Sequence, residues 1–205
     1  MSERAGSLPL VGGVLCLDFC NTTSGRGSPE VVEHLGEYGD VLRWAAHAGV
    51  LPQASAARIG RLLGEAESAR LLRRVLEARE VTRAVLEPVA NGRRPSGESL
   101  RAFNSLLAGA YAGARIAEDG GRLMWRFPPS DAEPDGLIGP ILRSAALVAT
   151  ERNPARLKVC PGRGCGWLFY DTTKNASRVW CEMQVCGSRA KARARYRRLR
   201  REQGG

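Results

Sequence analysis

The most informative segment of the sequence runs from residue 160 to residue 193 and reads CPGRGCGWLFYDTTKNASRVWCEMQVCGSRAKAR. It contains two close cysteine pairs, Cys160 with Cys165 and Cys181 with Cys186. Each pair can supply two thiolates from a tight turn, and the insert between the pairs is long enough to bring the two turns together. Four incidental buried thiols are the alternative. The paired spacing and the glycines of the first turn favour one tetrahedral Zn²⁺ site.

We expect this zinc to be structural rather than catalytic. A catalytic zinc keeps one coordination position open and usually has histidine or carboxylate ligands. The two histidines, His34 and His47, lie far upstream in a region of predicted helix. The sequence contains no nucleophilic triad, phosphate-binding loop, dinucleotide-binding motif or HExxH motif. We therefore expect that the protein is not an enzyme.

The positive charge of the chain is concentrated in its last quarter. The formal net charge is +10; residues 151–205 carry 14 Lys and Arg against 4 Asp and Glu, whereas residues 1–150 carry 17 of each. A run of basic residues from Arg189 to Arg201 follows the last cysteine directly. A metal-bound module that ends in a basic helix predicts nucleic-acid binding. A basic face for a protein or another anionic partner, and a merely solvated tail, remain as alternatives.

The aromatic insert between the cysteine pairs predicts a β-hairpin. Residues 167–171 (WLFYD) and 178–181 (RVWC) alternate as strands do, and residues 172–177 form their turn. In the glycine-rich turn 160–166, backbone amides can point at the thiolate sulfurs and offset their charge. Bound zinc would fold this module by joining two otherwise mobile turns.

A basic helix is predicted to follow the hairpin, from Arg189 to about Arg201, with Ser188 as its N-cap. The positive end of this helix would favour the thiolate form of Cys186. An apolar stripe along the helix is expected to pack on the aromatic side chains of the hairpin, leaving the basic residues for phosphate groups. The stripe consists of Ala192, Tyr196 and Leu199. The candidate nucleic-acid contacts are Lys174, Arg178, Arg189, Lys191, Arg193, Arg195, Arg197, Arg198, Arg200 and Arg201.

The first 150 residues are predicted to be mostly helical, with a small antiparallel sheet. Residues 14–21 (VLCLDFCN) alternate as a short strand and are followed by a loop at 22–29. Apolar spacing predicts helices from about Pro29 or Leu35 to His47, and then at 55–64, 66–89, 98–108 and 137–151. Residues 111–116 and 122–127 resemble a hairpin with a Gly-Gly turn, and 128–136 is a polar linker. Asn153-Pro154 marks the boundary to the cysteine module.

Other polar residues of the N-terminal part carry weaker signals. Asp18, Asn21 and Trp44 could line the pocket of a small-molecule sensor, although packing roles are the simpler reading of these residues. Cys16 and Cys20 fall on one face of the predicted strand, where two small buried residues are the simplest reading and a second metal or redox site is the alternative. The apolar stretch 8–17 is too short to span a bilayer. We expect a cytoplasmic protein, where paired cysteines favour metal over disulfides.

The chain resembles a known bacterial family. Residues 165–171 (CGWLFYD), 177–183 (SRVWCEM) and 186–193 (CGSRAKAR) are similar to the CGNR-type zinc finger, and 15–22 (LCLDFCNT) with Trp44-Ala45 are similar to the opening of the ABATE domain. The resemblance implies a stress-induced transcription regulator whose zinc ligands are Cys160, Cys165, Cys181 and Cys186. The asparagine of the CGNR motif is Ser188 here, and because serine is also a good N-cap, we expect the helix to start there.

The sequence thus predicts an α+β protein with two domains. Residues 1–152 form an ABATE-like helical domain that senses a signal or forms a homodimer, and residues 156–205 form a Cys₄ zinc finger with a basic C-terminal helix. DNA is the expected partner, with RNA or a protein as the alternative, and no membrane is involved.

Overall fold

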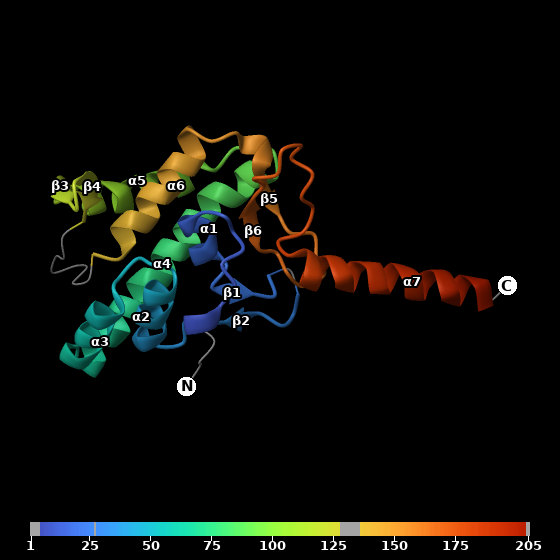
Figure 1. Cartoon of the computed structure of the whole chain (residues 1–205), viewed down its shortest axis with the longest axis horizontal. Coiled ribbons are helices and arrows are strands. Elements are labelled where there is room, and N and C mark those ends of the chain that lie inside the picture. Colours follow the sequence, from blue (N-terminus) through green and yellow to red (C-terminus); the bar gives the residue numbers. More distant parts are fainter. Residues whose placement is uncertain (1–4, 27, 128–135, 204–205) are drawn as a thin grey trace.

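The computed structural model describes residues 5–26, 28–127 and 136–203, and Figure 1 shows the molecule with its longest axis horizontal. Its helices are α1 (Leu15–Cys20), α2 (Tyr38–His47), α3 (Gln53–Leu62), α4 (Glu65–Ala90), α5 (Gly97–Tyr111), α6 (Ile138–Thr150) and α7 (Ser188–Gln203), with 3-10 turns at Ala5–Ser7 and Pro154–Arg156 and a π-helical turn at Met183–Gly187. Its strands are β1 (Thr23–Ser24), β2 (Val32–Glu33), β3 (Arg115–Asp119), β4 (Arg122–Arg126), β5 (Leu157–Val159) and β6 (Leu168–Tyr170). The strands pair as β1–β2, β3–β4 and β5–β6, all antiparallel. The fold class is α+β, as predicted.

The long helix α4 is the centre of the N-terminal part. Helices α1, α2, α5 and α6 all pack against it, and their buried side chains form one apolar core. Phe19 of α1 and Trp44 of α2 are completely buried in this core, with ring centroids 5.4 Å apart. Burial of a side chain of this size contributes on the order of 3 kcal/mol to folding. These contacts make the α4 bundle the rigid support for the rest of the chain.

Most elements of this part lie close to where the sequence predicts them. Helix α2 begins at Tyr38, later than expected, because Glu37 and Asp40 form a capping box that fixes its start. The expected loop at 22–29 begins with a short strand, β1, which pairs with β2. The hairpin β3–β4 is confirmed, although its first strand is Arg115–Asp119 rather than 111–116, because α5 continues to Tyr111. Gly120 and Gly121 in its turn have φ values of +59° and +80°. The expected linker 128–136 lies outside the described residues except for its last position.

The prediction of a strand at 14–21 is wrong, because this segment forms helix α1. Its residues from Cys16 to Cys20 are buried on every side of the helix. When a short segment is buried all round, its polarity pattern cannot distinguish a strand from a helix. The chain turns sharply before the helix at Gly13, which has a φ of +79°, and the carboxylate of Asp18 accepts a hydrogen bond from the Gly12 amide at 2.7 Å. This contact fixes the first turn of α1.

The hairpin of the cysteine module is also paired differently from the prediction. Strand β6 lies against β5, with Leu168 opposite Val159, and residues 178–181 are not a strand. The intervening loop is organised by Asp171, whose buried carboxylate accepts hydrogen bonds from Lys158 Nζ at 2.7 Å and from the Arg178 amide at 2.8 Å. Such side-chain to backbone bonds stabilise a compact loop in place of a second ladder. The first cysteine pair therefore lies in the turn of the β5–β6 hairpin.

Helix α7 projects from the body of the molecule (Figure 1), and the expectation that its apolar stripe packs on the hairpin is wrong. Tyr196 is 61% exposed and Leu199 is 41% exposed. The helix contacts the π-helical turn at its base. Its remaining length is open to solvent on the stripe as well as on the basic faces.

The cysteine module and the helical part share one hydrophobic core. Leu157, Leu168 and Tyr170 of the β5–β6 hairpin belong to the same buried cluster as the helices of the N-terminal part. The side chain of Asn21 bonds both backbone groups of Leu168, at 2.8 Å each, as a neighbouring strand would. The module is therefore continuous with the N-terminal core at the hairpin. No helix among the described residues is long and apolar enough to cross a membrane.

Candidate metal centre and nucleic-acid interface

Four cysteine sulfurs converge at the base of α7. Cys160 and Cys165 come from the turn between β5 and β6, while Cys181 precedes the π-helical turn and Cys186 lies within it. Their ligand atoms all lie within 4.8 Å of one another, with Sγ–Sγ distances of 3.6 Å for Cys165–Cys181 and 3.7 Å for Cys181–Cys186. Four sulfurs bonded to one zinc at 2.3 Å in tetrahedral geometry would be about 3.8 Å apart. The cluster thus has the size and donor set of a Cys₄ zinc site.

The first turn is shaped to present its two sulfurs together. The Cys160 amide donates to the carbonyl oxygen of Trp167 at 2.8 Å, which closes the turn. Gly164 and Gly166 have φ values of +68° and +66°, a conformation that other residues rarely adopt. Gly162 leaves space for the fourth ligand, because a Cβ there would lie 3.0 Å from the sulfur of Cys186. The backbone conformation and the close approach of the ligands thus require glycine at these positions of the turn.

The electrostatics of the cluster favour a bound cation. Hydrogen bonds from Cys165 and Cys181 hold the pKa of Cys160 far below its usual range, and backbone amides of Cys181 and Gly162 assist. The hydrogen bond between Cys181 and Cys160 raises the pKa of Cys181, so ionisation of Cys160 keeps the thiol of Cys181 protonated. A divalent cation removes this competition, because it stabilises all four thiolates at once. With four thiolate ligands and no open position, the zinc holds the turns together.

Ser188 has a different role from the one predicted. It is the first residue of α7 with helical dihedral angles (φ −63°, ψ −42°), so it is not an N-cap. Its hydroxyl donates to the carbonyl oxygen of Met183 at 3.3 Å, one turn back. Helical backbone begins after Glu182 with the π-helical turn Met183–Gly187, which leads into α7 and contains Cys186. The positive end of the helix is thus close to Cys186, as expected, although a π-helical turn provides it.

The basic residues of α7 are exposed along the whole helix. Seven of the predicted contacts on α7 are exposed side chains, and Arg193 is half-buried near the metal centre. The exposed ones are Arg189, Lys191, Arg195, Arg197, Arg198, Arg200 and Arg201. The guanidinium of Arg200 lies 5.8 Å from the ring of Tyr196. Lys174 is exposed in the loop that Asp171 organises.

Arg178 is placed differently from the other predicted contacts. Its guanidinium stacks 4.6 Å from the ring of Phe169 and donates to the carbonyl oxygens of Val11, Trp180 and Cys181. It therefore joins the segment before α1 to the second cysteine pair and does not face solvent as a phosphate contact would.

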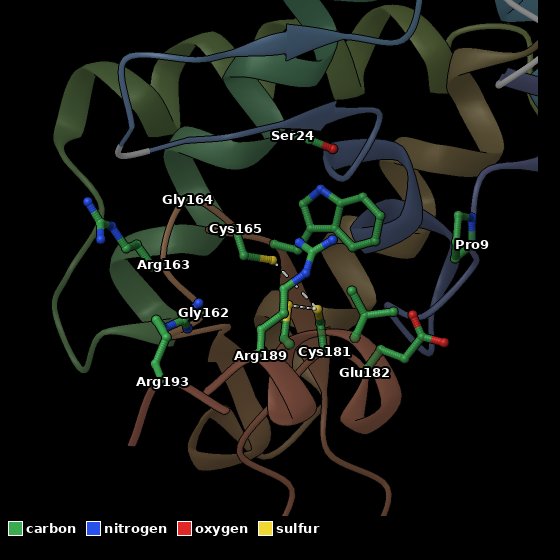
Figure 2. Close-up of a pocket in the computed structure, with 13 residues that line it drawn as sticks. Pro9, Ser24, Gly162, Arg163, Gly164, Cys165, Cys181, Glu182, Arg189 and Arg193 are labelled. Carbon is green, nitrogen blue, oxygen red and sulfur yellow. Dashed lines mark hydrogen bonds between the residues drawn. The ribbon is translucent and has the colours of Figure 1, made fainter. Parts of the chain in front are cut away.

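A groove of about 210 Å³ opens beside the cysteines (Figure 2). Arg163, Arg189 and Arg193 line it together with Glu182 and the indole of Trp167. A zinc bound by four thiolates carries a formal charge of about −2, so these arginines lie where they offset the charge of the loaded centre. Beyond this groove the exposed basic surface continues along the outer part of α7.

The three residues predicted for a sensor pocket lie in a filled interior. Trp44 and Asn21 are completely buried, the first against Phe19 and the second against the backbone of Leu168. Asp18 is 8% exposed, and burial raises its pKa to about 6 against the opposing hydrogen bond from Gly12. Their packing around α1 places them against neighbouring protein groups.

Cys16 and Cys20 lie on α1 and are completely buried, which agrees with the simplest reading of them as small core residues. Burial raises the pKa of Cys16 to about 12. Among the described residues, the group with metal-binding geometry is the one formed by Cys160, Cys165, Cys181 and Cys186.

Sequence reasoning missed two structural residues of the site. Asp171 organises the loop before the second cysteine pair, and Arg83 of α4 donates to the carbonyl oxygen of Gly166 at 2.7 Å. An aspartate followed by two threonines after a strand is a recognisable turn signal for the first. The role of Arg83 depends on the tertiary fold, and the sequence around it reads as ordinary surface helix.

Two family models match the chain. The ABATE model, described as "Putative stress-induced transcription regulator", matches residues 13–152, and the CGNR zinc finger model matches residues 156–199. The comparison with curated proteins gives no match. The four cysteines within the second match are the ligands of a single structural zinc. The chain therefore belongs to the ABATE family and carries a CGNR zinc finger at its C-terminal end.

Proposed function

We propose that this protein is a zinc-dependent DNA-binding protein that regulates transcription, and that α7 contacts the DNA. The observation that carries the proposal is the position of α7, which extends away from the body (Figure 1). Most of its basic side chains are exposed. A helix of 16 residues is about 24 Å long, enough to cross a major groove about 12 Å wide. The zinc centre would fix the direction in which this helix leaves the protein.

The exposed stripe on α7 suits the inside of a groove. Tyr196 and Leu199 are uncovered and can contact base edges or thymine methyl groups. Arg193 and Arg197 lie on one side of the stripe and Arg195 on the other, so both phosphate backbones would be within reach. We further propose that the protein acts by binding rather than by catalysis, because a Cys₄ zinc has no open position for a substrate.

The proposal is tested by anisotropy titration of a labelled duplex with the zinc-loaded protein between about 50 and 200 mM salt. Each phosphate contact contributes about −0.9 to the slope of log affinity against log salt, so seven contacts would give a slope near −6. Zinc-stripped protein should bind at least about tenfold more weakly, because the helix is no longer held at its base. Absence of salt-dependent binding by the zinc-loaded protein at low salt would disprove the proposal.

Binding to RNA or single strands is the second candidate, and the exposed pair of Tyr196 and Arg200 favours it. Stacking of an unpaired base on an aromatic ring beside an arginine is common in proteins that bind single strands. Competition of unlabelled duplex DNA, structured RNA and single strands against the labelled duplex separates the two candidates. Displacement by duplex DNA at the lowest concentration supports the first.

A further inference from the structure

The β3–β4 hairpin is the most exposed apolar surface among the described residues away from the finger. It lies at the end of the long axis opposite to α7 (Figure 1). Leu123 is 77% exposed and Ile116 is 51% exposed, and Met124 and Trp125 are also uncovered. Uncovered apolar side chains on a hairpin are typical of interaction surfaces.

The base of this hairpin is anchored, whereas its outer edge is open. Tyr111 at the end of α5 packs against Trp125 and Phe127 with centroid distances of 5.4 and 5.3 Å. In the described part of the chain β3 pairs with β4 alone, which leaves the other edge of β3 without a neighbouring strand. A two-stranded sheet is only marginally stable, and an added strand satisfies its open backbone groups.

The two ends of β3, which reads RIAED from Arg115 to Asp119, are complementary in charge when the strand is read in the opposite direction. Antiparallel pairing of two copies about Ala117 places Arg115 of each copy opposite Asp119 of the other. Ala117 then faces its own counterpart, and Met124, its cross-strand neighbour, extends the apolar centre on the same face. The small Ala117 side chain allows close approach, and the end positions hold two opposite-charge pairs. Ile116 lies opposite Glu118 on the other face of the sheet.

The other edge of the hairpin lacks this property. Strand β4 reads RLMWR from Arg122 to Arg126, so antiparallel pairing about Met124 would place Arg122 opposite Arg126 at both ends. Like charges directly opposite each other oppose pairing. Arg126 already forms an ion pair with Asp119, whose side chain stays 55% exposed, so the carboxylate remains accessible to a second arginine.

We propose that the β3 edge, Arg115–Asp119, pairs with the same edge of a second copy of this chain to form a four-stranded antiparallel sheet across a twofold axis. The interface is short, with five residues from each strand, so the expected dissociation constant is in the micromolar range. Helix α7 leaves the molecule at the opposite end, so the dimer keeps both basic helices uncovered (Figure 1). This inference concerns the free protein and does not depend on nucleic-acid binding.

Sedimentation velocity between about 1 and 500 µM tests the proposal with two charge reversals. Arg115→Glu places Glu opposite Asp119 at both ends, and Asp119→Arg places Arg opposite Arg115. Each single variant should dimerise at least about tenfold more weakly than the parent chain. A one-to-one mixture of the two variants should recover dimerisation, because Glu then faces Arg and Asp faces Arg across the heterodimer.

The double variant Arg115→Glu/Asp119→Arg should also recover the dimer. It does not restore the ion pair of Asp119 with Arg126, but Glu at position 115 lies opposite Arg126 within one chain. The mixture of single variants therefore decides whether recovery comes from contacts between copies. Arg101→Glu on the exposed face of α5 makes the same charge change outside the hairpin and should leave dimerisation unaltered. A parent chain that is monomeric at about 500 µM, single variants that dimerise normally, or a mixture that stays monomeric would each overturn the proposal.

Discussion

At the level of single residues, buried arginines contribute to the stability of the fold, whereas exposed arginines determine the electrostatic field outside the protein. Arg79 is 3% exposed and forms an ion pair with Glu33, and Arg178 has its guanidinium among three backbone carbonyl groups. The arginines of α7 have solvent around them. Loss of a buried arginine leaves unpaired acceptors inside the protein and affects stability. Loss of an exposed one changes the field that an external anion meets.

Asp18 is a buried carboxyl group without a cationic hydrogen-bond partner among the described contacts, and its titration makes stability depend on pH. The ordinary pKa is 3.8, and burial raises it to about 6, opposed by the hydrogen bond from Gly12. The folded state therefore holds this proton more tightly than the unfolded chain does. The contribution of Asp18 is most favourable below about pH 4 and decreases as the pH rises through 6, because the folded protein must then bury a charge.

We predict that Asp18→Asn removes this dependence. The amide oxygen can still accept the bond from Gly12, and nothing ionises. The free energy of unfolding of the variant relative to the parent should increase by about 1–3 kcal/mol between about pH 4 and pH 7. Urea titrations at several pH values measure the difference, with Glu98→Gln on the exposed side of α5 as the control. A difference that is constant across this range would contradict the prediction.

At the level of elements, the sequence predicts long amphipathic segments and cysteine turns well. Helices α3 to α6 and the β3–β4 hairpin follow from apolar spacing and from Gly120-Gly121, because these are local properties of the chain. The four zinc ligands follow from their spacing alone. In these regions local preference and the final fold agree.

Three elements could not be predicted, each for a physical reason. Helix α1 is buried on all sides, so its polarity carries no period. The sequence of β6 predicts a strand but not its partner. Strand β6 pairs with β5 because both belong to the shared core, and not with the aromatic segment 178–181. The apolar stripe on α7 predicts packing against the protein, because such stripes on helices usually face a core, but it is exposed. Its exposure reflects the direction in which the metal centre holds the helix.

The exposed stripe also makes α7 the element on which nucleic-acid affinity should depend. We predict that Arg193→Ala together with Arg197→Ala weakens DNA binding and reduces the slope of log affinity against log salt by about 2, since two phosphate contacts are lost. Anisotropy titrations at several salt concentrations measure the slope, and elemental analysis should still find one zinc per chain. Arg58→Ala with Arg61→Ala on α3 removes the same charge far from α7 and serves as the control. An unchanged slope in the α7 variant would exclude these two residues from the interface.

At the level of the whole molecule, the finger and the helical part are connected more closely than two separate domains would be. Trp167 donates from Nε1 to the carbonyl oxygen of Thr23 at 3.0 Å, and the Tyr170 amide donates to Gly12 at 2.8 Å. Together with the Asn21 contacts to Leu168, these bonds anchor the β5–β6 hairpin in the core. The metal centre therefore has a rigid support, and α7 is held at its base and extends away from that support.

A shared core implies that zinc release and loss of the helices occur together. We predict that denaturant titration of the zinc-loaded protein gives one transition, in which a zinc-binding dye and helical circular dichroism report the same midpoint. Asn21→Ala should lower both midpoints together, corresponding to about 2–4 kcal/mol, because both backbone groups of Leu168 lose their partner inside the core. Asn91→Ala removes an exposed amide at the end of α4 and should change the midpoints little. If the dye reports zinc release at a clearly lower denaturant concentration than helix loss, the finger opens independently and the core is not cooperative across the two parts.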